Sequence, residues 1–398
     1  MKRICVVTSS RADYGILVPL IQRLHMDLNV ELSIVVTGMH LCFEFGNTYR
    51  EIEADGYEIS KKIYIQEPGD SPSGMSKTMG NALIKFSDFF GKNRYDLLIV
   101  LGDRHEIMAV CCAATNERIP IAHIHGGETT EGAVDECYRH CITKMSALHF
   151  VSCEDYRKRV IQLGEHPGKV HNVGALCVEN ALNTSFLTIT ELENAIGLTL
   201  SGKPYAVVTF HPATLEENTG AKQLRELMLA LDAFPNMYFV ITKANSDAGG
   251  REINSIWEDY VKFRKNCILV ASLGMKKYLS ALKYSMVMIG NSSSGILEGP
   301  TFKIPTVNIG DRQKGRIKAS SIISCSPTSR DIKIAVDKAL SPEFQKLAQN
   351  VDNPYGNGNA SKKIVDVIRQ FTITEDVVKK SFYDIDYDEK SFCLKIYS

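Results

Sequence analysis

Short apolar runs alternate with longer amphipathic stretches along most of this chain. The short runs are rich in Val, Ile and Leu, which is typical of strands that are covered on both faces, as in a parallel sheet. The runs that predict strands are Arg3–Thr8, Val30–Val36, Asp96–Leu101, Ile119–Ile124, Ala147–Val151, Val170–Val173, Tyr205–Phe210, Met237–Thr242, Cys267–Val270, Met286–Ile289 and Pro305–Ile309.

The stretches between these runs carry apolar residues at helical spacing. In Tyr14–Met26, for example, Leu17, Leu20, Ile21 and Leu24 fall on one face of a helix. Further helices are predicted at Gln223–Ala233, Ile253–Phe263, Met275–Leu282 and Ser361–Phe371. Because repeated strand–helix units return to the same sheet by right-handed crossovers, the pattern predicts an α/β fold.

A polar segment near the middle of the chain predicts a boundary between two domains. Thr188–Pro204 contains Gly197, Gly202 and Pro204 and leads into a new strand. A length of 398 residues also favours two domains over one. We therefore expect two doubly wound halves of similar size. The charged and aromatic tail after Phe371 is predicted to be an arm that packs on another surface.

Composition narrows the classes of partner and compartment. The 46 Lys and Arg balance the 46 Asp and Glu, so the basic footprint of a nucleic-acid-binding or membrane-surface protein is missing. No apolar stretch approaches the length of a membrane span, and Ile4–Val7 is too short for the apolar region of a signal peptide. The 11 cysteines are odd in number and form no CxxC pair, which predicts a reducing, cytoplasmic location.

In open α/β sheets, ligands bind beyond the carboxyl ends of the strands, and the first half of this chain has three polar strand ends. The loop Thr8–Gly15 carries Arg11 and Asp13 before a helix, which suits a phosphate or merely a capped helix. The loop lacks GxGxxG, so it is not a nicotinamide-dinucleotide fingerprint. Asp103 and Arg104 follow the run that ends at Leu101, where a carboxylate beside an arginine is suited to proton transfer or to capping a helix.

The third strand end is the richest in ionisable groups. His123 and His125 have strand spacing, so they are expected to share one face. Glu128 follows a Gly pair, and Asp135 and Glu136 lie a little further on. Acid/base chemistry and a purely structural loop are both compatible with this cluster. Zinc is a poor match, because no third His or Cys stands at ligand spacing.

The second half of the chain carries loops suited to an anion. The Gly-rich loop Gly290–Gly299 holds Asn291, Ser292 and Ser293 between a strand and a helix, so amides and hydroxyls can converge on a phosphate. Glu298 is placed to reach ribose hydroxyls. The loop lacks the lysine of an ATPase P-loop. These features predict a nucleotide-diphosphate holder.

Two further strand ends complete this half. His211 follows Tyr205–Phe210 and is either a ligand or catalytic candidate or an ordinary hydrogen-bonding histidine. The loop Gly310–Arg316, which contains Arg312, is rich in cations that can meet a diphosphate. All 10 histidines fall at or before His211. Titratable groups therefore concentrate in the first half and anion-holding loops in the second, which suggests a cleft between them.

Together these motifs resemble those of hydrolysing UDP-N-acetylglucosamine 2-epimerases, in particular the bacterial branch that makes N-acetylmannosamine for sialic acid synthesis. The resemblance runs in order from Met1 to Phe371. The segments that carry it are Arg11–Tyr14, Leu101–Arg104, His123–Glu128, Val208–Pro212, Gly290–Gly295 and Asn308–Arg316.

The resemblance implies two Rossmann-like domains of the glycosyltransferase-B type, with the active site in the cleft between them. The first domain would comprise residues 1–178 and the second residues 179–360, with the C-terminal helix and tail, residues 361–398, returning to the first. It implies a homodimer or homotetramer, and neither a metal nor a nicotinamide cofactor. The implied reaction eliminates UDP from UDP-GlcNAc to give a 2-acetamidoglucal, which is then hydrated to N-acetylmannosamine.

The implied roles divide the candidate residues into two sets. Proton-transfer roles fall on Asp103, His125, Glu128, Asp135, Glu136 and His211, with Arg104 bridging the acids and the phosphates. Substrate and UDP contacts fall on Arg11, Asp13, Asn291, Ser292, Ser293, Glu298 and Arg312. At the position of His125, related enzymes resemble one another in carrying a glutamate, so either His125 or Glu128 takes that role.

Several alternatives remain open at this point. The same branch includes enzymes that act on UDP-2,4-diacetamido-2,4,6-trideoxy sugars for legionaminic acid. A non-hydrolysing epimerase would return UDP-ManNAc, and a glycosyltransferase would need an acceptor. A non-catalytic sugar-nucleotide-binding protein would bind UDP without turnover, but it would leave the clustered carboxylates unexplained.

Overall fold

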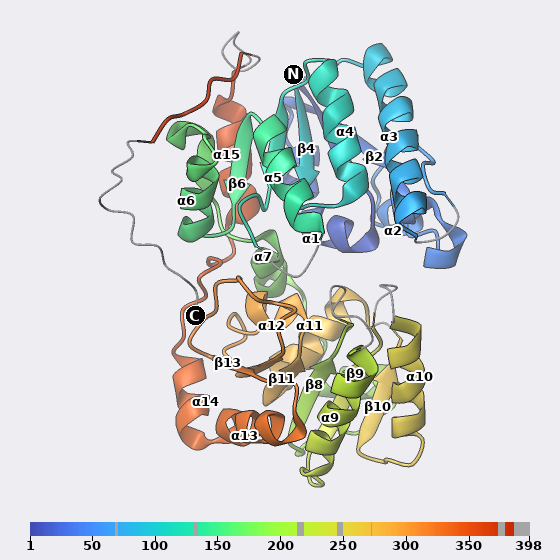
Figure 1. Ribbon diagram of the computed structural model, residues 1–398, viewed down its shortest axis with the longest axis vertical. Coiled ribbons are helices and arrows are strands. Elements are labelled where there is room, and N and C mark those ends of the chain that lie inside the picture. Colours follow the sequence, from blue (N-terminus) through green and yellow to red (C-terminus); the bar gives the residue numbers. More distant parts are fainter. Residues whose placement is uncertain are drawn as a thin grey trace.

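Two parallel β-sheets, each covered by helices on both faces, form the two layers of the molecule (Figure 1). The computed structural model describes residues 1–67, 71–129, 134–212, 219–244, 250–271, 273–372 and 379–385. The predicted α/β fold is confirmed. Within these residues no helix is both long enough and apolar enough to cross a membrane.

The first sheet has seven strands in the order β3-β2-β1-β4-β5-β6-β7, and the second has six in the order β10-β9-β8-β11-β12-β13. In chain order the strands are β1 (Lys2–Thr8), β2 (Val30–Val36), β3 (Ile59–Lys62), β4 (Leu97–Leu101), β5 (Ile121–Ile124), β6 (Leu148–Val151), β7 (Val170–Asn172), β8 (Tyr205–Thr209), β9 (Tyr238–Thr242), β10 (Cys267–Val270), β11 (Val287–Gly290), β12 (Thr306–Ile309) and β13 (Ile322–Cys325).

Every predicted strand is present, and two that the sequence did not predict, β3 and β13, lie at sheet edges. Neither contains a fully buried residue. An edge strand is shielded on fewer sides than a central one, so β3 can carry Lys61 and Lys62 and lacks the continuous apolar run that marks the central strands.

Helices connect the strands in the expected manner. They are α1 (Arg11–His25), α2 (Tyr49–Ala54), α3 (Pro72–Lys92), α4 (His105–Asn116), α5 (Asp135–Met145), α6 (Glu154–Gln162), α7 (Leu176–Asn183), α8 (Ile189–Ile196), α9 (Gly220–Asp232), α10 (Gly250–Val261), α11 (Gly274–Tyr284), α12 (Ser293–Leu297), α13 (Ser329–Leu340), α14 (Pro342–Gln349) and α15 (Ala360–Gln370). Short 3₁₀ turns occur at Gly38–Leu41, Phe43–Phe45 and Pro167–Lys169.

The polar segment Thr188–Pro204 contains a helix, α8, and is therefore more than a linker. Thr188 and Glu191 form a reciprocal capping box at its start. Gly197, in the left-handed region at φ 73°, ends it. Its apolar face, with Leu192 and Ile196 buried, packs into the core on one side of the second sheet.

The C-terminal helix α15 packs with the first layer although it follows the second layer in sequence (Figure 1). Its buried residues Ile364, Val365 and Ile368 share a core with Leu17 and Leu20 of α1. The ammonium of Lys2 donates a hydrogen bond to the Ile368 carbonyl at 2.6 Å. The exact division into residues 1–178 and 179–360 stays a prediction.

The two layers touch through an apolar cluster beside the strand ends. Tyr156 from α6 and Tyr355, both fully buried, share this cluster with Ile296 and Leu297 of α12. Their hydroxyls lie 3.1 Å apart, and the Tyr355 hydroxyl donates to the Ile317 carbonyl at 2.8 Å. This contact brings the loop after β12 against the first layer.

Gly290, the last residue of β11, allows β8 and β11 to approach each other closely. Its φ is 139°, and a Cβ at this position would lie only 1.9 Å from the Thr209 carbonyl oxygen. No other residue fits this conformation without displacing the backbone of β8. The loop that begins at Asn291 is thereby placed directly beside the loop that begins after Thr209.

Candidate active site

Glu128 and His125 form a buried acid–imidazole pair beyond the end of β5. Their side chains are almost fully buried, and the Nδ1 atom of His125 lies 3.5 Å from Oε1 of Glu128. Ser152 also donates to this oxygen, at 2.9 Å. The Nε2 atom of His125 has no hydrogen-bond partner among the described residues. An oriented imidazole with one unoccupied nitrogen is suited to exchange a proton with a bound substrate.

An arginine from the second layer completes this pair. Nη1 of Arg316, in the loop after β12, lies 3.1 Å from Oε2 of Glu128. Burial alone raises the pKa of Glu128, but the charges of Arg316, His125 and Arg139 outweigh it and bring this pKa down to about 2. Burial is also the main cause that lowers the pKa of His125. The pair is therefore an ionised carboxylate beside a neutral imidazole.

Arg139 of α5 joins two strand ends. It is ion-paired with Asp103, which follows β4, and it donates to the His125 carbonyl at 3.1 Å. Its other contact, with Glu128 at 3.9 Å, is weaker. The predicted candidates Asp103, His125 and Glu128 are thus brought together, and the arginine that holds them was not among the predicted site residues.

His123 does not share a face with His125, so that expectation was wrong. His125 has left β5 and has a positive φ of 65°. His123 bridges Thr143, at 3.1 Å, and the Gly102 carbonyl, at 2.7 Å, and its burial lowers its pKa to about 3. It is a structural histidine. No group of three His, Cys, Asp or Glu is arranged to hold a metal ion within the described ranges.

A second cluster surrounds Arg104 at the start of α4. Its Nε donates to Oε1 of Glu106 at 2.5 Å. Burial raises the pKa of Glu106, but Arg104 and His105 outweigh it, and the pKa is lowered. Burial also raises the pKa of Asp13, against the charge of Arg104. Glu106 is buried and was missed as a site residue because an acid in the first turn of a helix is usually exposed.

The first turn of α5 adds two more predicted acids. Glu136 lies 3.3 Å from the ring of His140, one turn along the helix. Asp135 is half-buried, and burial together with the nearby charge of Asp103 raises its pKa to about 6, against the opposing effect of Arg104. Asp135 is therefore poised to gain or lose a proton near neutral pH, where Glu128 stays ionised.

Asp135→Asn is expected to stabilise the protein at pH 7.5. The pKa of Asp135 in the folded protein, about 6, lies above the ordinary value of about 3.9. The folded state therefore favours the protonated acid, and ionised Asp135 opposes folding above pH 6. After screening by solvent we expect a gain of about 1–2 kcal/mol in the free energy of unfolding. Urea unfolding at pH 7.5 measures it.

The gain should shrink as the pH falls through 6 towards 4, because wild-type Asp135 becomes protonated over that window. Asp155, exposed in the first turn of α6, provides the matched control. Asp155→Asn should bring no such gain. Equal stabilities of wild type and Asp135→Asn at both pH values would contradict the assignment.

In the second layer, Asn291 fastens His211 to the end of β11. The two residues exchange hydrogen bonds of 2.8 Å between the Asn291 amide group and the backbone N–H and carbonyl of His211. The Asn291 carbonyl accepts from Arg312 at 3.2 Å and from Gln313 at 3.0 Å. Asn291 thus organises the loops that were predicted to hold UDP, and its own amide is committed to that task.

The serine loop and Glu298 lie next to this cluster. Ser292 caps α12 by accepting from the Ser294 N–H at 3.3 Å, and Ser293 begins the helix. Burial raises the pKa of Glu298 to about 7, and its Oε2 has no hydrogen-bond partner among the described residues. A half-protonated acid with a vacant oxygen is suited to hydrogen-bond a hydroxyl group.

Two expectations about cations differ from the structure. Arg316 belongs to the loop that was expected to meet a diphosphate, but it is ion-paired with Glu128. Arg11 begins α1 with an exposed side chain. Asp13 accepts from the Ser9 hydroxyl at 2.8 Å, within its own loop. The contribution of Arg11, Asp13 and Arg312 to UDP binding stays a prediction.

Comparisons with known proteins agree with this site. The profile of the family described as UDP-N-acetylglucosamine 2-epimerase matches residues 22–369. The chain belongs to this family. A relative from Escherichia coli, named polysialic acid biosynthesis protein P7, is 42% identical over 97% of this chain and 98% of its own. A Campylobacter jejuni relative, named GDP/UDP-N,N'-diacetylbacillosamine 2-epimerase (hydrolyzing), is 40% identical over 96% and 99%.

Solved structures show the same fold at lower sequence identity. The UDP-GlcNAc 2-epimerase of Neisseria meningitidis bound to UDP-GlcNAc superimposes with a TM-score of 0.80 at 18% identity, covering 93% of this chain and all of that one. The Methanocaldococcus jannaschii enzyme in complex with UDP-GlcNAc and UDP gives 0.77 at 17%, covering 93% of this chain and 100% of that one. This epimerase-family chain therefore has the two-domain fold of the glycosyltransferase-B type that was expected.

Proposed function

We propose that this chain is a hydrolysing 2-epimerase that converts UDP-GlcNAc and water into N-acetylmannosamine and UDP. The observation that carries the proposal is the His125–Glu128 pair, whose unoccupied Nε2 faces no protein partner among the described residues. The hydrolysing relative from Campylobacter jejuni, 40% identical, supports hydrolysis over simple epimerisation.

The first half of the reaction is an elimination. A base removes the proton at C2, the C1–O bond to UDP breaks, and UDP leaves with the electron pair, which gives a 2-acetamidoglucal. Neutral His125 suits the base, because Glu128 at 3.5 Å stabilises the imidazolium that forms. The loops around Asn291 and Arg312 suit the departing diphosphate.

The second half is a hydration. Water adds its oxygen to C1, and C2 receives a proton on the opposite face, so the configuration at C2 is inverted. This half needs a second proton carrier. Asp135, with a pKa of about 6, is able to change its protonation state at neutral pH. Asp103 and Arg139 hold α5, which carries Asp135, against the end of β4.

One alternative substrate has an observation of its own. The Campylobacter jejuni relative and a Legionella pneumophila relative, 32% identical, are both named for N,N'-diacetylbacillosamine. The alternative function is therefore the same hydrolysing epimerisation of a UDP-2,4-diacetamido-2,4,6-trideoxy sugar, for legionaminic acid. The Escherichia coli relative, named for polysialic acid, supports N-acetylmannosamine as the product and a place before sialic acid synthesis.

The test is a product analysis in heavy water. We expect the protein to release UDP from UDP-GlcNAc and to form N-acetylmannosamine with deuterium at C2, as followed by NMR. A parallel incubation with the 2,4-diacetamido-6-deoxy sugar nucleotide decides between the two substrates by their ratio of kcat/KM. UDP-ManNAc as the product would indicate a non-hydrolysing epimerase. Absence of UDP release from both substrates would overturn the proposal.

A further inference from the structure

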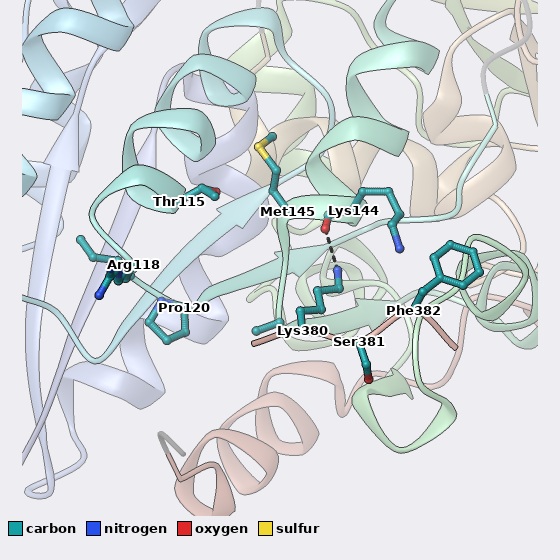
Figure 2. Close-up of a pocket in the computed structure, with 10 residues that line it drawn as sticks. Thr115, Arg118, Pro120, Lys144, Met145, Lys380, Ser381 and Phe382 are labelled. Atoms are coloured by element: carbon teal, nitrogen blue, oxygen red, sulfur yellow. Dashed lines mark hydrogen bonds between the residues drawn. The ribbon is translucent and has the colours of Figure 1, made fainter. Parts of the chain in front are cut away.

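A short segment of the C-terminal tail, Lys379–Ile385, packs on the first layer away from the candidate active site. We call it the strap. Figure 2 shows its Lys380 reaching the end of α5, where the ammonium donates to the carbonyls of Lys144 and Ser146, each at 2.7 Å. A longer contact of 3.4 Å reaches the carbonyl of Thr143.

These carbonyls belong to the last turn of α5, where helical carbonyls lack partners within the helix. A cation there satisfies them and interacts favourably with the negative end of the helix dipole. Lys380 also pairs with Glu165 at 2.7 Å. Burial raises the pKa of Glu165, but His149, Lys144 and Lys380 outweigh it and lower this pKa to about 2. The ammonium therefore balances a buried carboxylate as well as the helix end.

The rest of the strap keeps Lys380 in place. Tyr383 donates its N–H to the Gly164 carbonyl at 2.9 Å, and its ring lies 5.3 Å from that of His166. The ring of Phe382 covers Gly164 so closely that a Cβ there would lie 2.3 Å from it. Beside these contacts the strap borders a hollow of about 560 Å³. Its attachment therefore rests on a few specific groups, and Lys380 makes most of the polar contacts.

The helix that Lys380 caps carries part of the candidate active site. Its first turn contains Asp135, and Arg139 on the next turn holds Asp103. Near its last turn, Thr143 contacts His123, whose other ring nitrogen binds the carbonyl of Gly102, the residue before Asp103. A shift of this helix end would therefore move Asp103 and Asp135 together.

We propose that Lys380 is a positioning residue for the reaction and that it acts through α5. This proposal rests on the proposed function. Lys380 touches neither the acid–imidazole pair nor the loops of the second layer. It fixes the far end of the helix whose near end presents the acids. Because a displacement of about 1 Å at the reacting groups can slow a reaction about 10²-fold, loss of this cap should affect turnover more than substrate binding.

Lys380→Met removes the three donors but keeps the length of the side chain. We expect kcat for UDP release to fall at least about tenfold, while KM stays within about twofold of wild type. Lys380→Arg, which keeps the charge, should recover most of kcat. Ser381→Ala, at the exposed neighbour in the strap, is the matched control and should leave both constants unchanged.

Hydrogen exchange over residues 139–146 provides the second measurement, and it does not depend on turnover. Lys380→Met should exchange these amides faster than wild type, whereas Ser381→Ala should not. Unchanged kcat, or a loss of kcat matched by an equal loss of folded protein, would overturn the proposal. If wild type releases no UDP from either sugar nucleotide, the proposed function fails, and the exchange rates alone then decide whether Lys380 fixes α5.

Discussion

Glu128→Gln is expected to lower kcat for UDP release by about 10³-fold, within the range by which positioned acid/base groups accelerate reactions. The substitution keeps the shape of the side chain and leaves an oxygen for the Ser152 hydroxyl. It removes the charge that stabilises an imidazolium at His125, 3.5 Å away. Steady-state release of UDP, measured by a coupled assay, gives the effect directly.

The substitution also leaves Arg316 without its charged partner, so the loss needs to be assigned. The double variant Glu128→Gln/Arg316→Met removes both charges. If the loss came from the unpaired arginine, the double variant would regain activity; if it came from proton transfer, it would not. Glu154→Gln, at an exposed position of α6, should behave like wild type. A Glu128→Gln rate within threefold of wild type would remove Glu128 from the mechanism.

Asp103→Asn is expected to lower kcat by about 10²-fold. Asp103 neutralises the buried Arg139 and thereby holds α5 against the end of β4. With a neutral amide, the guanidinium keeps its contacts with the His125 carbonyl and Glu128 but loses its ionic partner. Deuterium incorporation at C2 in heavy water, measured together with UDP release, shows whether proton transfer slows.

Asp88→Asn serves as the comparison, because Asp88 is an exposed carboxylate on α3. It should leave turnover and deuterium incorporation unchanged. Equal rates for Asp103→Asn and Asp88→Asn would contradict the role of Asp103.

The sequence predicts most of this architecture because parallel strands buried on both faces leave continuous apolar runs. The central strands β1, β4 and β8 are such runs and were found at the expected places. The edge strands β3 and β13 were missed, because partial burial leaves no strong pattern. The helix α8 was missed for another reason: its Thr188–Glu191 capping signal lies in a segment whose overall polarity suggested a linker.

The candidate site could be predicted only in part. Strand ends were sufficient to find Asp103, His125 and Glu128, because the carboxyl ends of parallel strands meet at one edge of a sheet. The role of Arg316 depends on how the two layers close on each other, which no local pattern encodes. The positive φ of His125, which separates it from His123, is likewise set by tertiary contacts.

The Glu128–Arg316 ion pair makes proton affinity and domain geometry a single thermodynamic variable. One partner belongs to each layer, so any separation of the layers removes the cation that holds the pKa of Glu128 at about 2. Parting the layers therefore strengthens Glu128 as a base, and acid favours the parted arrangement. Closure over a substrate, conversely, expels a proton from the site. Movement of the domains would thus work as a proton valve built from two side chains.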